Sequence, residues 1–168
     1  MEFSPKRKSK SDKKTEVICW GSDSFGQLGL GTERQNSKPL TIPRFCTFNI
    51  KILMVACGEE HAGFITNSNL IYMMGSNSEG QLGIGDKGSI YKNSPVLIDD
   101  LVNKKPCFLA CGSNHTAALT DKGELFTWGC GVTGALGIGD IVNQWSPKQV
   151  VLYDRGRQPY FNYVACGS

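Results

Sequence analysis

Short apolar runs separated by turn residues follow one another along residues 17–168. Four kinds of run recur in a fixed order: one with a polar-to-proline step (SKPLTI, NSPVLI, WSPKQVVL), one ending in Ala-Cys-Gly (KILMVACG, CFLACG, YFNYVACG), one starting at His (HAGFIT, HTAALT) and one rich in aromatic residues or Met (LIYMMG, ELFTWG). Their length, composition and boundary residues predict β-strands. The turns TNSNL and TDKGE predict hairpins between the third and fourth runs.

This pattern predicts eleven strands. One lies at 17–20, two sets of four lie at about 38–74 and 94–128, and two more lie within about 147–166. We take each set of four as one unit. We expect the Gly-rich loop that follows its last strand to lead into the next unit.

The chain repeats itself at a constant pitch. The stretches WGSDSFGQLGLG (20–31), MGSNSEGQLGIG (74–85) and WGCGVTGALGIG (128–139) start 54 residues apart, and the stretches VACGEEHAGFIT (55–66), LACGSNHTAALT (109–120) and VACGS (164–168) recur at spacings of 54 and 55. Four antiparallel strands per repeat of this length are typical of a β-propeller blade. A helical solenoid would need 3.6-residue periodicity, and a β-sandwich would not require similar Gly-rich loops at a fixed pitch.

One Gly-rich loop resembles a dinucleotide-binding turn, because Gly129, Gly131 and Gly134 spell G-x-G-x-x-G after a predicted strand. That turn requires a helix directly after it, and ALGIGD holds two more glycines that would break one. The other two copies of the loop also lack the middle glycine. The sequence therefore predicts no nucleotide cofactor.

Charge divides the 168 residues into two parts. Residues 1–14 hold six Lys or Arg against two acidic residues, whereas the remainder is close to neutral. We expect a disordered basic tail over residues 1–15 and one repeat region over residues 16–168. The tail is interpreted as a solvated arm, as an import signal at PKRK, or as a weak non-specific contact for nucleic acid.

Composition bears on membrane contact, disulfide bonds and metal binding. The sequence shows no apolar run of about 20 residues and no secretory signal, so we expect no membrane contact and a cytoplasmic or nuclear protein. Seven cysteines, an odd number, indicate free thiols rather than a disulfide framework. Cys107 and Cys111 have no second pair of ligands, so we expect no metal site.

The repeats resemble those of the regulator of chromosome condensation family. The family's A-C-G-x-x-H-[ST] and W-G-x-[GN]-x-x-G-Q-L-G-x-G patterns are met by ACGSNHT (110–116) and GSNSEGQLGIG (75–85), and the resemblance covers about residues 17–168. In ACGEEHA (56–62) the hydroxyl after His is missing, Ala135 replaces Gln, and Met74 stands in the place of Trp. The resemblance implies a seven-bladed β-propeller and, for most members, a scaffold or GTPase-regulating role.

The number of strands departs from that family pattern. The chain holds about two full blades plus partial ones, too few to close a ring. We interpret it as a fragment of a seven-bladed propeller; the alternatives are a truncated gene model and a piece that completes itself by assembly. An open arc would expose sheet edges and apolar blade faces.

Small and apolar residues of the repeats are expected to be structural. The glycines permit positive φ, the leucines and Trp20, Met74 and Trp128 fill the contact between blades, and the cysteines act as small apolar residues of an inner strand. The structural set is Gly21, Gly26, Leu28, Gly29, Gly31, Gly75, Gly80, Leu82, Gly83, Gly85, Gly129, Gly134, Leu136, Gly137, Gly139, Trp20, Trp128, Cys57, Cys111 and Cys166.

The two histidines, His61 and His115, occupy the same repeat position. No nucleophile and acid are arranged around either in the sequence, so we predict no catalytic residue and expect a hydrogen-bonding strut. In exchange-factor members of the family this position lies towards the face that engages the GTPase. Carried over, the resemblance implies a partner face of His61, His115, Glu59, Glu60 and Asn114, the last in the place of Glu60.

Three functions follow from these observations. The first is a non-enzymatic protein-interaction module that regulates a small GTPase or another protein partner. The second is a guanine-nucleotide exchange factor for a Ran-like GTPase, although the loops at 32–37, 86–93 and 140–146 have ordinary lengths and none resembles the β-wedge that the family uses for exchange. The third is a chromatin-associated protein whose tail contacts DNA phosphates.

Overall fold

The structure is a computed structural model that describes residues 16–43, 50–153 and 158–168. The basic tail predicted over residues 1–15 lies outside the described residues. The described chain forms ten strands and the short 3₁₀ turn η2 (Asp99–Leu101). The strands are β1 (Ile18–Gly21), β2 (Asn36–Thr41), β3 (Ile52–Cys57), β4 (His61–Thr66), β5 (Ile71–Ser76), β6 (Tyr91–Leu97), β7 (Pro106–Cys111), β8 (His115–Thr120), β9 (Leu125–Gly129) and β10 (Gln144–Gln149).

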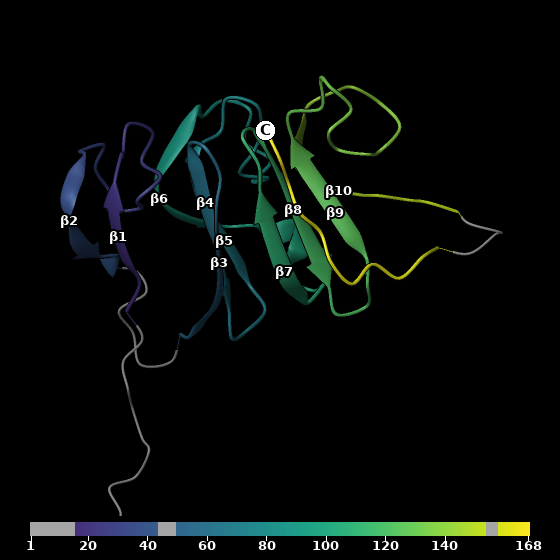
Figure 1. The fold of residues 1–168 in the computed structure, drawn as a ribbon, viewed down its shortest axis with the longest axis horizontal. Coiled ribbons are helices and arrows are strands. Elements are labelled where there is room, and N and C mark those ends of the chain that lie inside the picture. Colours follow the sequence, from purple (N-terminus) through teal and green to yellow (C-terminus); the bar gives the residue numbers. More distant parts are fainter. Residues whose placement is uncertain (1–15, 44–49, 154–157) are drawn as a thin grey trace, which may run out of the picture.

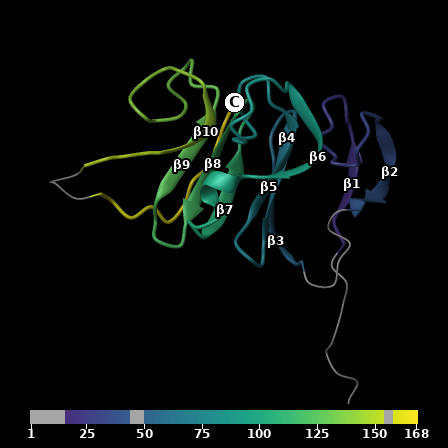
Figure 2. The same cartoon turned by 180° about the vertical axis from the view of Figure 1, so that it is seen from behind.

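The strands form three antiparallel sheets. Sheet A holds β1 and β2, sheet B holds β3 to β6 in chain order, and sheet C holds β7 to β10 in chain order. The sheets stand side by side in the order A, B, C in both views (Figures 1 and 2). The prediction of an all-β fold with four-stranded antiparallel units is confirmed.

The predicted grouping of strands into units is wrong by one strand. The strand with the polar-to-proline step does not open a sheet but closes the preceding one, because β6 pairs with β5 and β10 pairs with β9. The Gly-rich loop after β5 therefore joins two strands of one sheet, and the chain passes from sheet B to sheet C between β6 and β7. Proline lacks an N–H group and is tolerated on an edge strand, which is where Pro95 and Pro147 lie.

The expected eleventh strand, within 158–168, is not assigned as a strand. These residues run along sheet C beside β7 and β8 (Figure 1). They are held there by hydrogen bonds from the Phe161 N–H to the Gly123 carbonyl (3.0 Å) and from the Ser113 N–H to the Gly167 carbonyl (3.2 Å). In the described chain no strand pairs along their edge, so they form no β-ladder.

The core lies between the sheets rather than within any one of them. The larger cluster joins Ile65, Ile71, Met73 and Leu82 of the sheet B region to Leu109, Ala118, Phe126 and Trp128 of sheet C. A smaller cluster joins Val17 and Ile42 to Ala62, Phe64 and Met74 of sheet B. Because each sheet buries its apolar faces only against a neighbour, the repeats depend on one another for stability.

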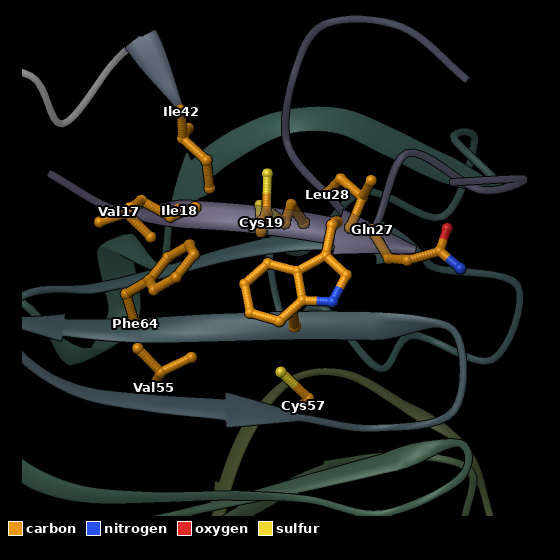
Figure 3. A pocket seen from close by; sticks show the side chains of 12 residues that line it. Val17, Ile18, Cys19, Gln27, Leu28, Ile42, Val55, Cys57 and Phe64 are labelled. Carbon is orange, nitrogen blue, oxygen red and sulfur yellow. The ribbon is translucent and has the colours of Figure 1, made fainter. Parts of the chain in front are cut away.

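The repeated leucines are all buried, whereas the repeated Trp positions differ in burial. Leu28, Leu82 and Leu136 are buried, and Leu82 lies in the cluster that sheets B and C share. Trp128 is fully buried, whereas Trp20 is 62% exposed in the described chain and lines an apolar cavity between sheets A and B (Figure 3). The indole of Trp128 donates to the Gln81 carbonyl in the Gly-rich loop of the preceding sheet.

The glycines of the Gly-rich loop permit close contact between neighbouring sheets. Gly83 has φ of +66°, and a Cβ atom built there would lie 2.7 Å from Nε1 of Trp128. Gly137 holds the same repeat position with φ of +64°, but a Cβ atom there would meet nothing within 4 Å. The two glycines thus share a backbone requirement, and only Gly83 has a packing requirement as well.

We expect the Gly83→Ala variant to lose about 2–4 kcal/mol of unfolding free energy. The left-handed backbone costs about 1–2 kcal/mol for a residue with a Cβ atom, and the clash with the buried indole adds to that. Gly137→Ala is the matched control and should lose only the backbone part. Urea unfolding followed by circular dichroism measures both; equal losses would refute the packing argument.

Candidate protein-interaction face

A buried hydrogen-bond network joins sheets B and C at the repeated His position. Nε2 of His61 lies 2.9 Å from Oγ1 of Thr116, whose hydroxyl donates to the Gln81 carbonyl at 2.8 Å. The same carbonyl accepts the indole N–H of Trp128 at 2.9 Å. His61 and Thr116 are buried, and their side chains belong to different sheets. Three repeat motifs, the His strand, the aromatic strand and the Gly-rich loop, therefore meet at one point.

The network determines the protonation state of His61. The Thr116 hydroxyl has one proton, which it donates to a carbonyl, so it must accept the bond from His61. Nε2 of His61 therefore carries a proton. Nδ1 is buried and has no hydrogen-bond partner. Burial, together with the nearby His115, lowers the pKa of His61 from 6.5 to about 4.

His115 occupies the same position one repeat later but in a more open setting. It is half-buried, and burial lowers its pKa. A Cβ atom added at Gly112 would lie 2.8 Å from Nδ1 of His115, just as His61 lies over Gly58. Each ring thus packs on the glycine of its own turn, and His61 in addition bonds to the next sheet.

The turns that carry the predicted partner residues lie in a row. The Glu59 N–H donates to the Gly112 carbonyl at 3.3 Å, and the Ser113 N–H donates to the Gly167 carbonyl at 3.2 Å. An open groove of about 590 Å³ runs along them. It is lined by Cys57, Gly58, Glu59, Cys111, Gly112, Ser113, Cys166, Gly167 and Ser168. Three successive repeats therefore present their Ala-Cys-Gly turns to one surface.

The five predicted partner residues do not all reach this groove. Glu59 is exposed and lines it. The carbonyls of Glu60 and Asn114 accept N–H bonds from Ser76 and Cys130, both at 2.8 Å, and so tie each turn to the end of β5 or of β9 in its own sheet. Neither Glu59 nor Glu60 forms an ion pair within the part of the chain that the structure describes.

The cysteines of the groove are not activated for chemistry. Burial raises the pKa of Cys57, Cys111 and Cys166, the last to about 11, so the thiols stay protonated at neutral pH. The described residues contain no group of three His, Cys, Asp or Glu side chains that could hold a metal ion. No helix in the described ranges is long and apolar enough to cross a membrane.

Sequence reasoning missed Gln81 as a central residue of the network. Its carbonyl accepts two bonds, while its buried side chain donates to Oγ of Ser76 and accepts from the Glu79 N–H. A signal was present, because Gln precedes Leu-Gly in two of the three Gly-rich loops. A repeated motif does not by itself show that its backbone carbonyl meets a side chain about 35 residues further on.

Comparison with known proteins identifies the repeat. The "Regulator of chromosome condensation (RCC1) repeat" family matches residues 16–65, 68–119 and 122–168, and a second profile of the same repeat matches residues 107–134. These matches cover most of the chain.

Individual relatives are much longer than this chain. The human probable E3 ubiquitin-protein ligase HERC4 is 37% identical over 139 residues, which are 82% of this chain and 13% of HERC4. The human X-linked retinitis pigmentosa GTPase regulator is 36% identical over 138 residues, again 82% of this chain and 13% of the relative. The chain thus spans about an eighth of the length of these relatives.

A solved structure shares the fold. Prp20p of Saccharomyces cerevisiae, whose structure was described with its binding to Gsp1p and histones, superposes with a TM-score of 0.80. The sequences are 22% identical, and the match covers 90% of this chain and 37% of Prp20p. The three sheets therefore correspond to part of a β-propeller of that type.

We expect stability to fall as pH falls from about 6.5 to about 4, because the unfolded chain then binds a proton at His61 that the folded chain excludes. The full contribution is about 3 kcal/mol. Chemical unfolding at a series of pH values measures it. His61→Gln should remove most of this pH dependence, whereas His115→Gln should keep most of it. An unchanged slope in His61→Gln would contradict the assignment.

We expect Thr116→Val to lose about 2 kcal/mol of unfolding free energy. Valine preserves the shape of the side chain. The buried His61 N–H then has no acceptor, and the Gln81 carbonyl loses the hydrogen bond from the Thr116 hydroxyl. Thr116→Ser retains the hydroxyl and should lose less than half as much. Thermal and urea unfolding compare the two, and similar losses would show that the hydroxyl is unimportant.

Proposed function

The chain belongs to the regulator of chromosome condensation (RCC1) repeat family, and from that premise we propose that it acts as a non-enzymatic protein-interaction module. The row of Ala-Cys-Gly turns is the surface that binds the partner. Its backbone is held by bonds between sheets, while the exposed Glu59 carboxylate faces an open groove. A rigid backbone with available side chains reduces the entropy lost on binding.

The chemistry of this surface supports binding rather than catalysis. His61 has one ring nitrogen bonded to Thr116 and the other buried, so it cannot take a proton from a substrate. The cysteines remain protonated thiols, since their pKa values are raised. Neither the His61 ring nor these thiols therefore supply an accessible base or an activated nucleophile.

The partner that we propose is a small GTPase that presents a basic patch. Glu59 and Glu60 add negative charge to the first turn, and this charge attracts Lys or Arg side chains. One relative is named a GTPase regulator, and the structure of Prp20p was described with its binding to Gsp1p. We place this activity in the cytoplasm or nucleus.

A second candidate function is guanine-nucleotide exchange on a Ran-like GTPase. The binding of Prp20p to Gsp1p and histones favours it, and the basic residues 1–14 would supply the contact to chromatin or to import receptors. The observation against it is the ordinary length of the loops at 32–37, 86–93 and 140–146, none of which resembles an inserted wedge.

We expect the double variant Glu59→Arg with Glu60→Arg to weaken binding to a Ran-type GTPase at least ten-fold, because like charges would meet. Asp100→Arg is the control. Asp100 is an exposed residue of η2, in the loop before β7, and so lies at the opposite end of β7 from the Ala-Cys-Gly turn. Biolayer interferometry over a panel of small GTPases measures binding. Absence of binding by the unsubstituted chain to every member would refute a GTPase partner.

The same proteins distinguish GTPase binding alone from guanine-nucleotide exchange. Release of labelled GDP from the bound GTPase should be no faster with the chain than without it if the chain only binds. Acceleration that the Glu59 and Glu60 substitutions abolish would instead establish the exchange function.

A further inference from the structure

We propose that Ser94 is a phosphorylation site for a serine kinase that requires proline as the next residue. The phosphate, once attached, weakens the rim contact, which we define as the hydrogen bonds of Asn93 in β6 to Gly31 and Glu33 of the loop between β1 and β2. Ser94 does not line the turn groove. Its modification therefore concerns a different surface and goes beyond the proposed function.

The first observation is a bulge at the Ser-Pro step of β6. The ladder between β5 and β6 shifts register between Met73 and Gly75, where β5 has one residue and β6 has three. These three residues are Asn93, Ser94 and Pro95. A bulge takes residues out of the regular ladder, and among the described residues β6 pairs on one edge only, with β5. Strand pairing therefore does not enclose the Ser-Pro step.

The second observation is that Ser94 is exposed although sheet B has a neighbouring sheet on each side. Its hydroxyl donates one long hydrogen bond, to Oδ1 of Asn93 at 3.4 Å. An unpaired segment at a sheet edge is accessible to the chain of another protein. A kinase can therefore reach the hydroxyl without opening the core between the sheets.

The residue after Ser94 determines which kinases accept the site. Proline has no N–H group, so a kinase that leaves this position of its substrate without a hydrogen-bond acceptor prefers Ser-Pro to other steps. In the reaction Oγ of Ser94 attacks the γ-phosphorus of ATP, and the bond from that phosphorus to the bridging oxygen of ADP breaks. The hydroxyl proton passes to the catalytic base of the kinase. Kinase and ATP are the only co-reactants.

The other two sheets contain the same bulge and provide comparisons. Lys38 of β2 and Ser146 of β10 hold the position of Ser94, and each is followed by proline. Lys38 has no hydroxyl, and Ser146 is only partly exposed. Ser37 is exposed but is followed by Lys38 rather than by proline. Within the described ranges, Ser94 alone combines an exposed hydroxyl with a following proline.

A phosphate on Ser94 would lie near a carboxylate that belongs to the loop of sheet A. Oδ1 of Asn93 is 3.4 Å from Oγ of Ser94, and Nδ2 of the same amide donates to Oε1 of Glu33 at 2.7 Å. The two groups thus lie about one Debye length apart, which is about 8 Å at physiological ionic strength. The phosphate adds about two negative charges. Lys92 is already bound to Asp86, with Nζ 3.1 Å from Oδ2. Repulsion from Glu33 therefore acts on the rim contact.

The backbone part of the rim contact lies beside the same hydroxyl. The Gly31 N–H donates to the Asn93 carbonyl at 2.7 Å, and a Cβ atom at Gly31 would lie 3.7 Å from Oγ of Ser94. A weaker rim contact exposes the Gly31 amide to solvent more often, which hydrogen exchange detects. The equivalent bond one repeat later, from the Gly85 N–H to the Trp145 carbonyl at 2.8 Å, is the internal reference.

The direct test is incubation of the folded chain with a purified proline-directed serine kinase and ATP, read by site with mass spectrometry. Ser4 and Ser146 also precede proline, so the chain carries Ser4→Ala and Ser146→Ala. We expect phosphate on Ser94, at a rate within about ten-fold of that of a peptide of residues 88–101, because little local opening is needed. A folded chain that is labelled more than about a hundred-fold slower than the peptide overturns the proposal.

Matched variants test the requirement for proline. Pro95→Ala should abolish the reaction at Ser94 although the hydroxyl remains, and circular dichroism checks that the variant is folded. Lys38→Ser leaves sheet B unchanged and should add a second phosphate, because its position has the same bulge, exposure and following proline. Ser37→Ala should leave the rate at Ser94 unchanged. Labelling of Ser94 that persists in folded Pro95→Ala overturns the proposal.

Hydrogen exchange of the phosphorylated chain tests the effect on the rim contact. We expect the Gly31 amide to exchange about five-fold faster or more after phosphorylation, and the Gly85 amide to be unchanged. Glu33→Gln removes the opposing charge and should remove most of the difference, as should added salt. An unchanged or slower exchange at Gly31 overturns the proposed weakening; slower exchange would mean that the phosphate pairs with a cation of the loop such as Arg34.

Discussion

The structure depends on the contact between neighbouring sheets. No sheet of four short strands can bury both faces by itself, and here the apolar residues of sheets B and C form one common cluster. The polar centre of this contact is the Gln81 carbonyl, which receives the Thr116 hydroxyl and the Trp128 indole while His61 bonds to Thr116. Because all these groups are buried, the network is stable only when every donor finds its acceptor, which fixes the position of one sheet on the next.

This contact also shapes the surface proposed for binding. The turns after β3 and β7 are tied to the following turn by backbone bonds, so each repeat places its turn in register with the next. The backbone of these turns is therefore held in the same way in successive repeats, and their side chains differ. Glu59 and Glu60 make the first turn acidic, whereas Ser113 and Asn114 make the second neutral. The first two turns of the row therefore differ in charge.

The contact between sheets A and B is built differently. Ala62 and Met74 occupy the positions that Thr116 and Trp128 hold in sheet C, so neither can repeat the polar network. An apolar cluster stands in place of the hydrogen bonds, and an apolar cavity lies between the two sheets.

The sequence by itself determined the fold class, the repeat pitch and the positions of ten of the eleven expected strands, because strand and turn preferences act over a few residues and the pattern recurs every 54 residues. It did not determine the grouping of strands, because the order of the runs along the chain is the same whether the polar-to-proline strand opens one sheet or closes the preceding one. Nor did it distinguish Trp20 from Trp128 or Val55 from Leu109, which hold equivalent repeat positions but differ in burial. The protonation of His61 likewise depends on Thr116 and Gln81 together. Burial and hydrogen bonding between repeats are properties of neighbours in space, so only the tertiary structure decided them.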